Sequence, residues 1–123
     1  MSFKYSQTTG RMTGEAFEAL GYSGNGAGLN NPAMQDAHGV GPLPKGSYSI
    51  QPARTAPKVG TIAMRLTPAP GNTMFNRGDF LIHGDNYAMN RTASEGCIVM
   101  PHGARVAIAA RVLAGDTHLE VTA

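Results

Sequence analysis

The chain of 123 residues has a single cysteine and no long run of apolar residues. One cysteine excludes an internal disulfide, so the fold does not depend on oxidation. The apolar runs fall well short of the roughly 20 residues that cross a bilayer, which argues against insertion into a membrane. The first ten residues, MSFKYSQTTG, lack the apolar core of a secretory signal. We therefore expect a chain that is made in the cytoplasm and reaches any external target without an N-terminal signal.

Charge is also scarce, since only 15% of residues are charged and the net charge is +2. The ten lysines and arginines are scattered, with no basic run and no interleaved aromatic residues. This pattern argues against a nucleic-acid-binding surface, which needs clustered cations to contact phosphates. A weak positive field suits an anionic polymer or an acidic protein partner without establishing either. Because 41% of residues are hydrophobic, we expect a globular chain.

Glycine and proline are plentiful, with 16 and 8 copies, and a content this high is typical of short strands joined by tight turns. The patterns predict a single domain over residues 1–123, a mainly β fold, with about seven or eight mostly antiparallel strands in a sandwich or barrel. The expected strands are a hairpin around Thr9-Gly10 and segments near residues 15–22, 46–50, 61–68, 80–83, 97–100 and 117–122. The composition of residues 15–24 also fits a short helix, although a strand that ends at Tyr22 is favoured. Residues 23–46 are expected as a long loop without regular structure, of the kind that is functional or covers a site.

One helix is predicted near the C-terminus, at about residues 101–114. Pro101 suits the first turn of a helix, and Gly115 suits the position after its end. Helical spacing predicts one apolar stripe, with Arg105 and Arg111 away from it. The stripe consists of Val106, Ala109, Ala110 and Leu113. Strand alternation likewise predicts two shared faces, one of Phe3 and Tyr5 and one of Ile62, Met64 and Leu66.

The single cysteine lies in the segment FLIHGDNYAMNRTASEGCIVM, fourteen residues after a histidine. A thiol attacks an amide as thiolate, and a neighbouring imidazole takes its proton and returns it to the leaving amine. The segment therefore indicates Cys97 as nucleophile and His83 as base and later acid. The Gly84 carbonyl or the Asp85 carboxylate is expected to hold the imidazole in one tautomer. The alternative is a cysteine that only fills the core, which is the commoner use of a lone thiol.

The turn Ser94-Glu95-Gly96-Cys97 is expected to supply donors for an oxyanion. Acyl transfer develops negative charge on the carbonyl oxygen, and backbone N–H groups in a tight turn stabilise it most simply. The N–H groups of Gly96 and Cys97 are the candidates. Gly96 is also expected to let the substrate carbonyl approach, because it has no side chain.

Four segments, taken in order, resemble a known family. IHGDN followed by SEGCI resembles the active-site signature of the YkuD-type L,D-transpeptidases, and GPLPKGSYSI resembles the segment that precedes a core strand there. GYSGNGAGLNNPAMQDAHGVGPLPKGSY, MFNRGDFLIHGDN and ASEGCIVMP resemble more closely the small L,D-transpeptidase effectors of type VI secretion. The resemblance extends from about Tyr5 to Val121.

The resemblance implies a β-rich catalytic domain that forms a cysteine acyl-enzyme and uses no cofactor. Its substrate would be the peptidoglycan stem peptide, cut between diaminopimelate and D-Ala by Cys97. Water would then complete a carboxypeptidase reaction, a D-amino acid an exchange, and an amine of a neighbouring stem a cross-link. An antibacterial effector of this kind would leave through secretion machinery, act in the periplasm of a target cell and require an immunity protein in the producer.

The sequence departs from the broad transpeptidase pattern in two places. The pattern has a second histidine before the glycine, where this chain has Glu95, and Arg or Asn after the cysteine, where it has Ile98-Val99-Met100. Both features match the effector branch better. A glutamate cannot supply the donors of an imidazole at neutral pH. The oxyanion site and the acceptor preference therefore stay open, with trimming or exchange favoured over cross-linking.

Ser94 and Asp85 each have a structural and a functional interpretation. Ser94 is expected mainly to fix the turn by a local hydrogen bond, with a contact to substrate as the alternative. Asp85 would orient His83, bind the side-chain amine of diaminopimelate or cap the loop. The sequence does not rank these three roles.

Three residues inside the matching segments, together with Glu95, complete the candidate substrate contacts. Tyr22 is one of them, without a more specific role. Asn31 precedes a proline and is expected chiefly as a turn former. Arg77 would hold a substrate carboxylate by two parallel hydrogen bonds, or else remain solvated.

Two other functions remain open from the sequence. A zinc peptidase would use His83, Asp85 and His102 as ligands, with Glu95 as general base. That hypothesis lacks an HExxH-like helical pair and leaves the lone cysteine unexplained. The second is a non-catalytic wall-binding or phage-structural module, in which Cys97→Ala would bind wall fragments as the native chain does.

Overall fold

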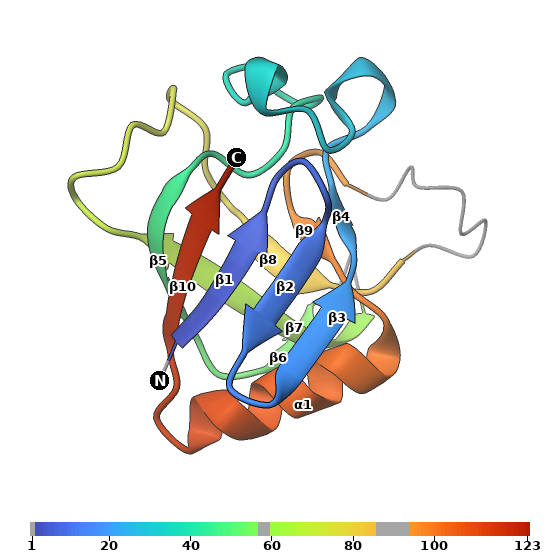
Figure 1. Cartoon of the computed structure of the whole chain (residues 1–123), viewed down its shortest axis with the longest axis vertical. Helices are drawn as coiled ribbons and strands as arrows, with labels where there is room; N and C mark the ends of the chain where they lie inside the picture. The colour runs from blue at the N-terminus through green and yellow to red at the C-terminus, as the bar shows by residue number, and fades with distance from the viewer. Residues whose placement is uncertain (1, 57–59, 86–93) are drawn as a thin grey trace.

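The computed structural model describes residues 2–56, 60–85 and 94–123 of the chain (Figure 1). Within them lie ten strands, two short 3-10 helices and one α-helix. The strands are β1 (Ser2–Ser6), β2 (Arg11–Gly14), β3 (Phe17–Leu20), β4 (Tyr22–Ser23), β5 (Gly46–Ile50), β6 (Arg54–Ala56), β7 (Gly60–Pro68), β8 (Leu81–His83), β9 (Ile98–Val99) and β10 (His118–Thr122). The helices are η1 (Gly26–Gly28), η2 (Pro32–Met34) and α1 (His102–Leu113). The prediction of a mainly β fold with one helix near the C-terminus is confirmed.

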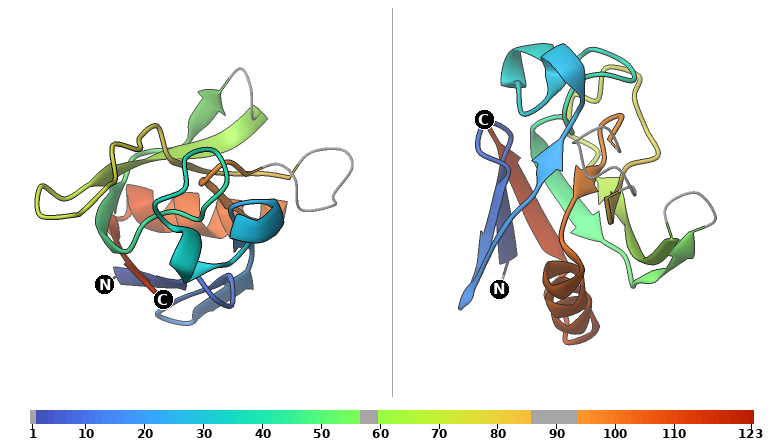
Figure 2. Two further views of the ribbon diagram at one scale, coloured as in Figure 1. Left: turned by 90° about the horizontal axis from the view of Figure 1, so that it is seen from above. Right: turned by 90° about the vertical axis from the view of Figure 1, so that its right-hand side faces the viewer.

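The strands belong to one sheet that curls until its edges nearly meet. Its order is β3-β2-β1-β10-β5-β7-β8-β9-β4, with β6 paired to β7. β3 and β4 stand at opposite ends of this order, yet only Gly21 separates them in the chain. Gly21 permits this closure because a Cβ at that position would collide with the Val99 carbonyl oxygen. The observed form is therefore the barrel of the two predicted alternatives (Figure 1, Figure 2).

Most strand pairs are antiparallel, as predicted, but two are parallel. β1 pairs with β10, with Phe3 opposite Leu119. β8 pairs with β9, with Ile82 opposite Ile98 and His83 opposite Val99. The alternation of a single strand carries no information on the direction of its neighbour, so neither parallel pair was predictable from the sequence. The second pair joins the strand that ends at His83 to the strand that follows Cys97.

The core lies inside the curled sheet and extends to α1. Phe3 and Tyr5 are both buried on β1, which confirms the face predicted for them. β1 is an interior strand, between β2 and β10, so the N-terminal segment is part of the barrel. The other buried members of the core are Met12, Leu43, Tyr48, Ile50, Met64, Leu66, Phe80, Ile82, Ile98, Met100, Ile108, Val112, Leu119 and Val121.

β7 departs from simple alternation near its start. Met64 and Leu66 are buried as predicted, but Ile62 is only half-buried. Ile62 has a φ of +54°, in the left-handed region that β-branched residues rarely adopt. The resulting kink turns the neighbouring Ala63 inward as well, so that it is also buried.

α1 covers one end of the barrel and buries a different face from the predicted one (Figure 1). Ile108 and Val112 are buried, whereas Val106 is 46% exposed and Leu113 is 79% exposed. The helix is rich in alanine, so several stripes fit its spacing, and packing against the sheet selects one of them. Of the predicted stripe only Ala109 packs against the core, and the prediction is wrong for its other three members. Arg105, expected away from the packed face, is half-buried.

The ends of α1 follow the predicted signals with one shift. Pro101 is the N-cap residue rather than a residue of the first turn. Gly115 has a φ of +105°, and its N–H donates to the Val112 carbonyl at 3.0 Å. The Asp116 N–H donates to the Arg111 carbonyl at 2.9 Å, which completes a Schellman motif. The predicted position of Gly115 after the helix end is confirmed.

Residues 23–46 were expected as an irregular loop, but they contain η1 and η2. The segment lies at the end of the barrel opposite α1 (Figure 2). The Asn31 side chain accepts a hydrogen bond from the Ala33 N–H at 3.1 Å and donates to the Ala27 carbonyl at 3.0 Å. Asn31 therefore caps η2, in keeping with the turn-forming interpretation.

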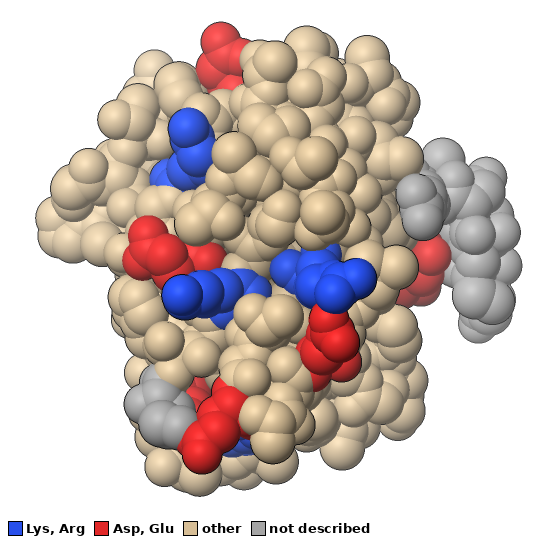
Figure 3. Space-filling model, in the orientation of Figure 1, with Lys and Arg blue, Asp and Glu red and all other residues tan. Residues whose placement is uncertain are grey.

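The face shown in Figure 3 is mostly uncharged, with basic and acidic side chains interspersed. Arg11 and Glu18, for example, form an ion pair between two exposed side chains of β2 and β3. The described residues gather no basic patch on this face. No helix in the described part of the chain is long and apolar enough to cross a membrane.

Candidate active site

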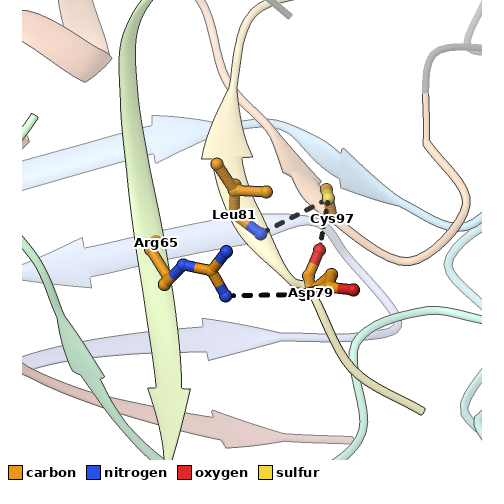
Figure 4. Close-up of polar contacts among 4 residues, drawn as sticks. All are labelled: Arg65, Asp79, Leu81 and Cys97. Atoms are coloured by element: carbon orange, nitrogen blue, oxygen red, sulfur yellow. Dashed lines mark hydrogen bonds and ion pairs between the residues drawn. The ribbon is translucent and has the colours of Figure 1, made fainter. Parts of the chain in front are cut away.

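Cys97 ends the turn 94–97 and directly precedes β9. Its Sγ accepts a hydrogen bond from the Leu81 N–H at 3.3 Å and lies 3.9 Å from the Asp79 carbonyl oxygen (Figure 4). The side chain is partly exposed. The thiol therefore lies against backbone polar groups of the segment that leads into β8, and it is not sealed in the apolar core.

Ser94 holds the turn through three hydrogen bonds of one hydroxyl group. Its Oγ accepts from the Gly24 N–H at 2.9 Å and from the Gly96 N–H at 3.0 Å. The same group donates to the Cys97 carbonyl at 2.6 Å. The side chain is fully buried, so it fixes the turn and offers no surface to a substrate. Of the two interpretations of Ser94, the geometry matches the structural one.

Gly96 is needed for packing rather than for an open approach to the thiol. It has a φ of +134°, and a Cβ there would lie 2.5 Å from both Arg77 Nη2 and a ring carbon of Phe80. Its N–H is already donated to Ser94 Oγ. Both expectations for Gly96, an open path and an oxyanion donor, are thus corrected. The Cys97 N–H remains as a donor, since no described residue accepts a hydrogen bond from it.

His83 ends β8, and its side chain is almost fully buried. Nδ1 lies 2.7 Å from the Gly84 carbonyl oxygen. Because a carbonyl only accepts, Nδ1 carries the proton, and Nε2 of the neutral ring is the basic nitrogen. Of the two orienting groups expected, the Gly84 carbonyl makes this contact. Asp85 instead accepts a hydrogen bond from the Tyr22 hydroxyl at 2.7 Å.

The parallel pairing of β8 and β9 brings Cys97, the residue before β9, beside the start of β8, the strand that ends at His83. His83 pairs with Val99, which is two residues after Cys97. Leu81, whose N–H binds the thiol, is two residues before His83. The register therefore sets the candidate nucleophile beside the start of β8 and the candidate base at the end of the same strand.

Burial favours the neutral forms of both groups. It raises the pKa of the Cys97 thiol, while the hydrogen bond from the Leu81 N–H opposes this shift. It lowers the pKa of the His83 imidazole, and the nearby charge of Arg105 acts in the same direction. A resting thiolate–imidazolium pair is therefore disfavoured. The arrangement suits general-base chemistry, in which the proton leaves the thiol as the attack begins.

Arg105 is a neighbour of His83 that the sequence did not reveal. It extends from α1, where Nε donates to the Met100 carbonyl at 3.1 Å and Nη1 to the Thr61 carbonyl at 2.8 Å. Nη2 lies 2.7 Å from the place that a Cβ on Gly84 would occupy. Residue 84 is therefore glycine at a point where a guanidinium packs against the backbone. No sequence pattern near Gly84 or Arg105 predicts this contact, because it forms only when α1 packs against the sheet.

Arg77 is neither solvated nor available to a substrate carboxylate. It is 9% exposed, and the Cζ atom of its guanidinium lies 5.2 Å from the centre of the Phe80 ring. All four terminal N–H groups donate to backbone carbonyls. The acceptors are Gln35 at 2.7 Å, Pro42 at 2.8 Å, Gly41 at 2.9 Å and Glu95 at 3.0 Å. A bidentate contact needs two free N–H groups, so both expectations for Arg77 are corrected.

Tyr22 and Asp85 are joined at the edge of the site. Tyr22 pairs with Val99 between β4 and β9, so it shares the rung of His83. Its ring is buried while its hydroxyl reaches the Asp85 carboxylate. Asp85 and Glu95 are both exposed. The chain thus has one exposed carboxylate two residues after the base, held by the Tyr22 hydroxyl, and another two residues before the nucleophile.

The zinc hypothesis gains no support from the residues that it named. Within residues 2–56, 60–85 and 94–123, no three His, Cys, Asp or Glu side chains lie close enough together to hold a metal ion. His102 lies at the exposed start of α1.

One comparison with known proteins found a match to this chain. A family model described as the Tlde1 domain covers residues 17–123, which is all of the chain except its first sixteen residues. The chain belongs to the Tlde1 domain family. No curated protein and no solved structure matches it.

Membership of the Tlde1 domain family points to an effector of type VI secretion, consistent with an antibacterial toxin. It also suggests that the chain is secreted and that secretion machinery and an immunity protein are its partners. All candidate site residues, from Tyr22 to Arg105, lie inside the matched Tlde1 domain. β1 and β2 precede the match, although β1 is an interior strand of the same sheet.

Proposed function

We propose that this chain is a cysteine-dependent L,D-carboxypeptidase or L,D-transpeptidase that acts on peptidoglycan stem peptides in the periplasm of a target cell. One observation carries the proposal. The partly exposed Cys97 thiol directly precedes β9, the His83 imidazole ends the adjacent parallel strand β8, and Nδ1 of the imidazole is committed to the Gly84 carbonyl. The basic Nε2 is thereby left to serve the thiol. The resemblance of the segments around His83 and Cys97 to L,D-transpeptidases supplies the substrate class.

The first half of the reaction forms a thioester. His83 Nε2 removes the thiol proton as Sγ attacks the carbonyl carbon between diaminopimelate and D-Ala. The C–S bond forms, the C–N bond breaks, and the imidazolium returns the proton to the departing amine of D-Ala. The Cys97 N–H is our candidate for the oxyanion donor, because the Gly96 N–H is used by Ser94.

The second half transfers the acyl group to an acceptor. Water gives the trimmed tripeptide, a free D-amino acid gives exchange, and the amine of a second stem gives a cross-link. In each case His83 takes a proton from the acceptor, and Sγ leaves and regains the thiol proton. Glu95 stands where the broad pattern has an imidazole, so we expect trimming and exchange to exceed cross-linking.

Asp85 is our candidate for recognition of the diaminopimelate side chain. Its carboxylate is exposed, and the Tyr22 hydroxyl holds one of its oxygens. A carboxylate fixed in this way attracts the ammonium group of diaminopimelate. Arg77 is not proposed as a substrate contact, because its terminal N–H groups are used internally.

Mass spectrometry of disaccharide-tetrapeptide incubated with the protein tests the proposal. The native chain is compared with Cys97→Ala, with and without EDTA, and with added D-Met. We expect loss of D-Ala, and replacement of D-Ala by D-Met, both abolished by Cys97→Ala and unaffected by EDTA. Activity that survives the substitution and is lost with EDTA would show that a metal ion, and not the Cys97 thiol, is required for the reaction. No conversion by the native chain under any condition would contradict the proposed activity and favour a binding module.

A further inference from the structure

Arg77 connects the turn of the nucleophile to a distant segment of the chain. Nη1 donates to the carbonyls of Gln35 and Pro42, and Nη2 donates to those of Gly41 and Glu95. Three of these acceptors lie between η2 and β5, whereas Glu95 is two residues before Cys97. One buried guanidinium therefore ties residues 35–42 to the turn 94–97.

The fit of Arg77 against the turn is close. Its Nη2 and the Phe80 ring occupy the space where Gly96 would carry a Cβ. Phe80 in turn lies between Asp79, whose carbonyl faces the thiol, and Leu81, whose N–H binds it. The guanidinium thus packs against the turn 94–97, which carries Sγ. It also stacks on Phe80, the residue between the two backbone groups near Sγ.

We propose that Arg77 is a positioning residue of the reaction, which holds the turn 94–97 so that the Cys97 thiol faces the Leu81 N–H. The inference rests on the proposed function only for its kinetic consequence. Its structural part concerns the thiol itself and is measurable without any peptidoglycan substrate.

The charge of Arg77 also favours the thiolate. Among the groups that face Sγ, Glu95 and Asp79 raise the pKa of the Cys97 thiol, and Arg77 and the Leu81 N–H lower it. Burial exceeds all of these influences and raises the pKa. Loss of the guanidinium therefore removes the cation that opposes burial and the two carboxylates.

The test compares Arg77→Gln and Arg77→Lys with the native chain and with Arg11→Gln. Arg11 is exposed on β2 and pairs with Glu18, so it is a matched arginine outside the site. For each protein, the rate of Cys97 alkylation by iodoacetamide is measured against pH, together with the melting temperature and with kcat and KM for D-Ala release. Lysine keeps the charge but has only three donors in a different geometry.

We expect Arg77→Gln to shift the alkylation profile to higher pH, with a rate at neutral pH that falls about tenfold for each unit of that shift. We expect kcat to fall by roughly 10- to 100-fold and KM to change less than about threefold, because a misplaced nucleophile affects the chemical step. Arg77→Lys should recover much of the alkylation profile but little of kcat. Arg11→Gln should match the native chain.

A folded Arg77→Gln variant with the native alkylation profile and a kcat within about twofold of native would overturn the inference, since a misplaced thiol loses much more. A lower melting temperature alone, with both readouts unchanged, would assign Arg77 to stability. If alkylation shifts as expected but the native chain releases no D-Ala, the positioning role stands and the proposed function fails.

A second measurement needs no Arg77 variant and covers the case in which these variants do not fold. The nitrogen chemical shifts of the Arg77 guanidinium are followed by NMR from neutral to alkaline pH in the native chain, with Cys97→Ala as the blank. A change that tracks thiol ionisation and disappears in Cys97→Ala supports the contact. Shifts that do not respond to the thiol would overturn it.

Discussion

Cys97 and His83 each stand beside a glycine against which an arginine from elsewhere in the chain packs. On the nucleophile side, Gly96 admits Arg77, and on the base side, Gly84 admits Arg105. The two sides differ in how firmly they are held. Arg77 is nearly buried and donates four hydrogen bonds from its terminal nitrogens, whereas Arg105 is half-buried and donates two from its guanidinium.

The backbone repeats this difference. Gly96 has a φ of +134°, where a side chain is strained whatever the space around it, while Gly84 is not among the residues with positive φ. Ser94 adds three further hydrogen bonds to the nucleophile turn, whereas the imidazole is oriented by one described contact, to the Gly84 carbonyl. The position of the thiol is therefore fixed by a dense local network of hydrogen bonds, and that of the base mainly by the end of a strand.

The largest expected effect concerns the nucleophile itself. Cys97→Ala removes the only thiol, and we expect D-Ala release to fall at least about 1000-fold, because no other group can form the acyl-enzyme. The melting temperature should stay close to native, since the thiol is partly exposed. D-Ala release is measured by mass spectrometry. Retention of more than a tenth of the native rate would remove Cys97 from the mechanism.

The base should contribute somewhat less. His83→Gln is expected to lower kcat by roughly 100- to 10,000-fold, the usual range for removal of a general acid–base. His118→Gln is the matched control, because His118 is half-exposed on β10 beside Glu120. Steady-state kinetics of D-Ala release compares the two variants. Equal effects of the two substitutions would show that the imidazole at position 83 has no special role.

Substitutions of Gly96 and Gly84 test directly how tightly each of the two glycines is packed. Gly96→Ala meets Arg77, the Phe80 ring and an unfavourable φ, and we expect it to destabilise the fold by roughly 3 kcal/mol. Gly84→Ala meets only the flexible end of Arg105, and we expect a loss below about 1 kcal/mol. Denaturant unfolding of both variants gives the two free energies. A larger loss for Gly84→Ala would reverse the comparison.

The smallest expected effect is a shift in the pH dependence of activity. His83 acts as base only when neutral, and burial and Arg105 lower its pKa, so the acidic limb of kcat/KM should lie below the ordinary value of about 6.5. Arg105→Gln removes the cation that lowers this pKa, and the limb should therefore move to higher pH.

The control for this shift is Arg111→Gln, on the same helix, where the arginine contacts the Phe17 ring and the Glu15 carbonyl. The pH profile of kcat/KM should be native in this variant. A limb that stays in place in Arg105→Gln would show that the guanidinium does not act on His83.

Much of the fold was predictable because strands and turns carry local signals. The mainly β class, the helix after Pro101 and the glycine that ends it all follow from patterns within a few residues. The buried stripe of α1 was not predictable, since alanines make several faces equivalent until the sheet selects Ile108 and Val112.

Most residues of the site could be named from the sequence, but several of their roles could not. The Gly84 carbonyl was one of two groups expected to orient His83, and it could be named because adjacent residues are close whatever the fold. The tasks of Gly96 and Arg77 were not foreseen, because each depends on the other across the fold. Arg105 was missed altogether for the same reason.

The reactive groups follow from the sequence alone: one thiol, an imidazole upstream, and glycines where the backbone had to be free of side chains. These depend on residue identity and on neighbours along the chain. The tertiary structure alone decided that β8 and β9 run parallel, that the Gly96 N–H is used by Ser94, and which arginine packs beside which glycine. These choices depend on which distant segments meet, and burial and close packing settle that only once the barrel has closed.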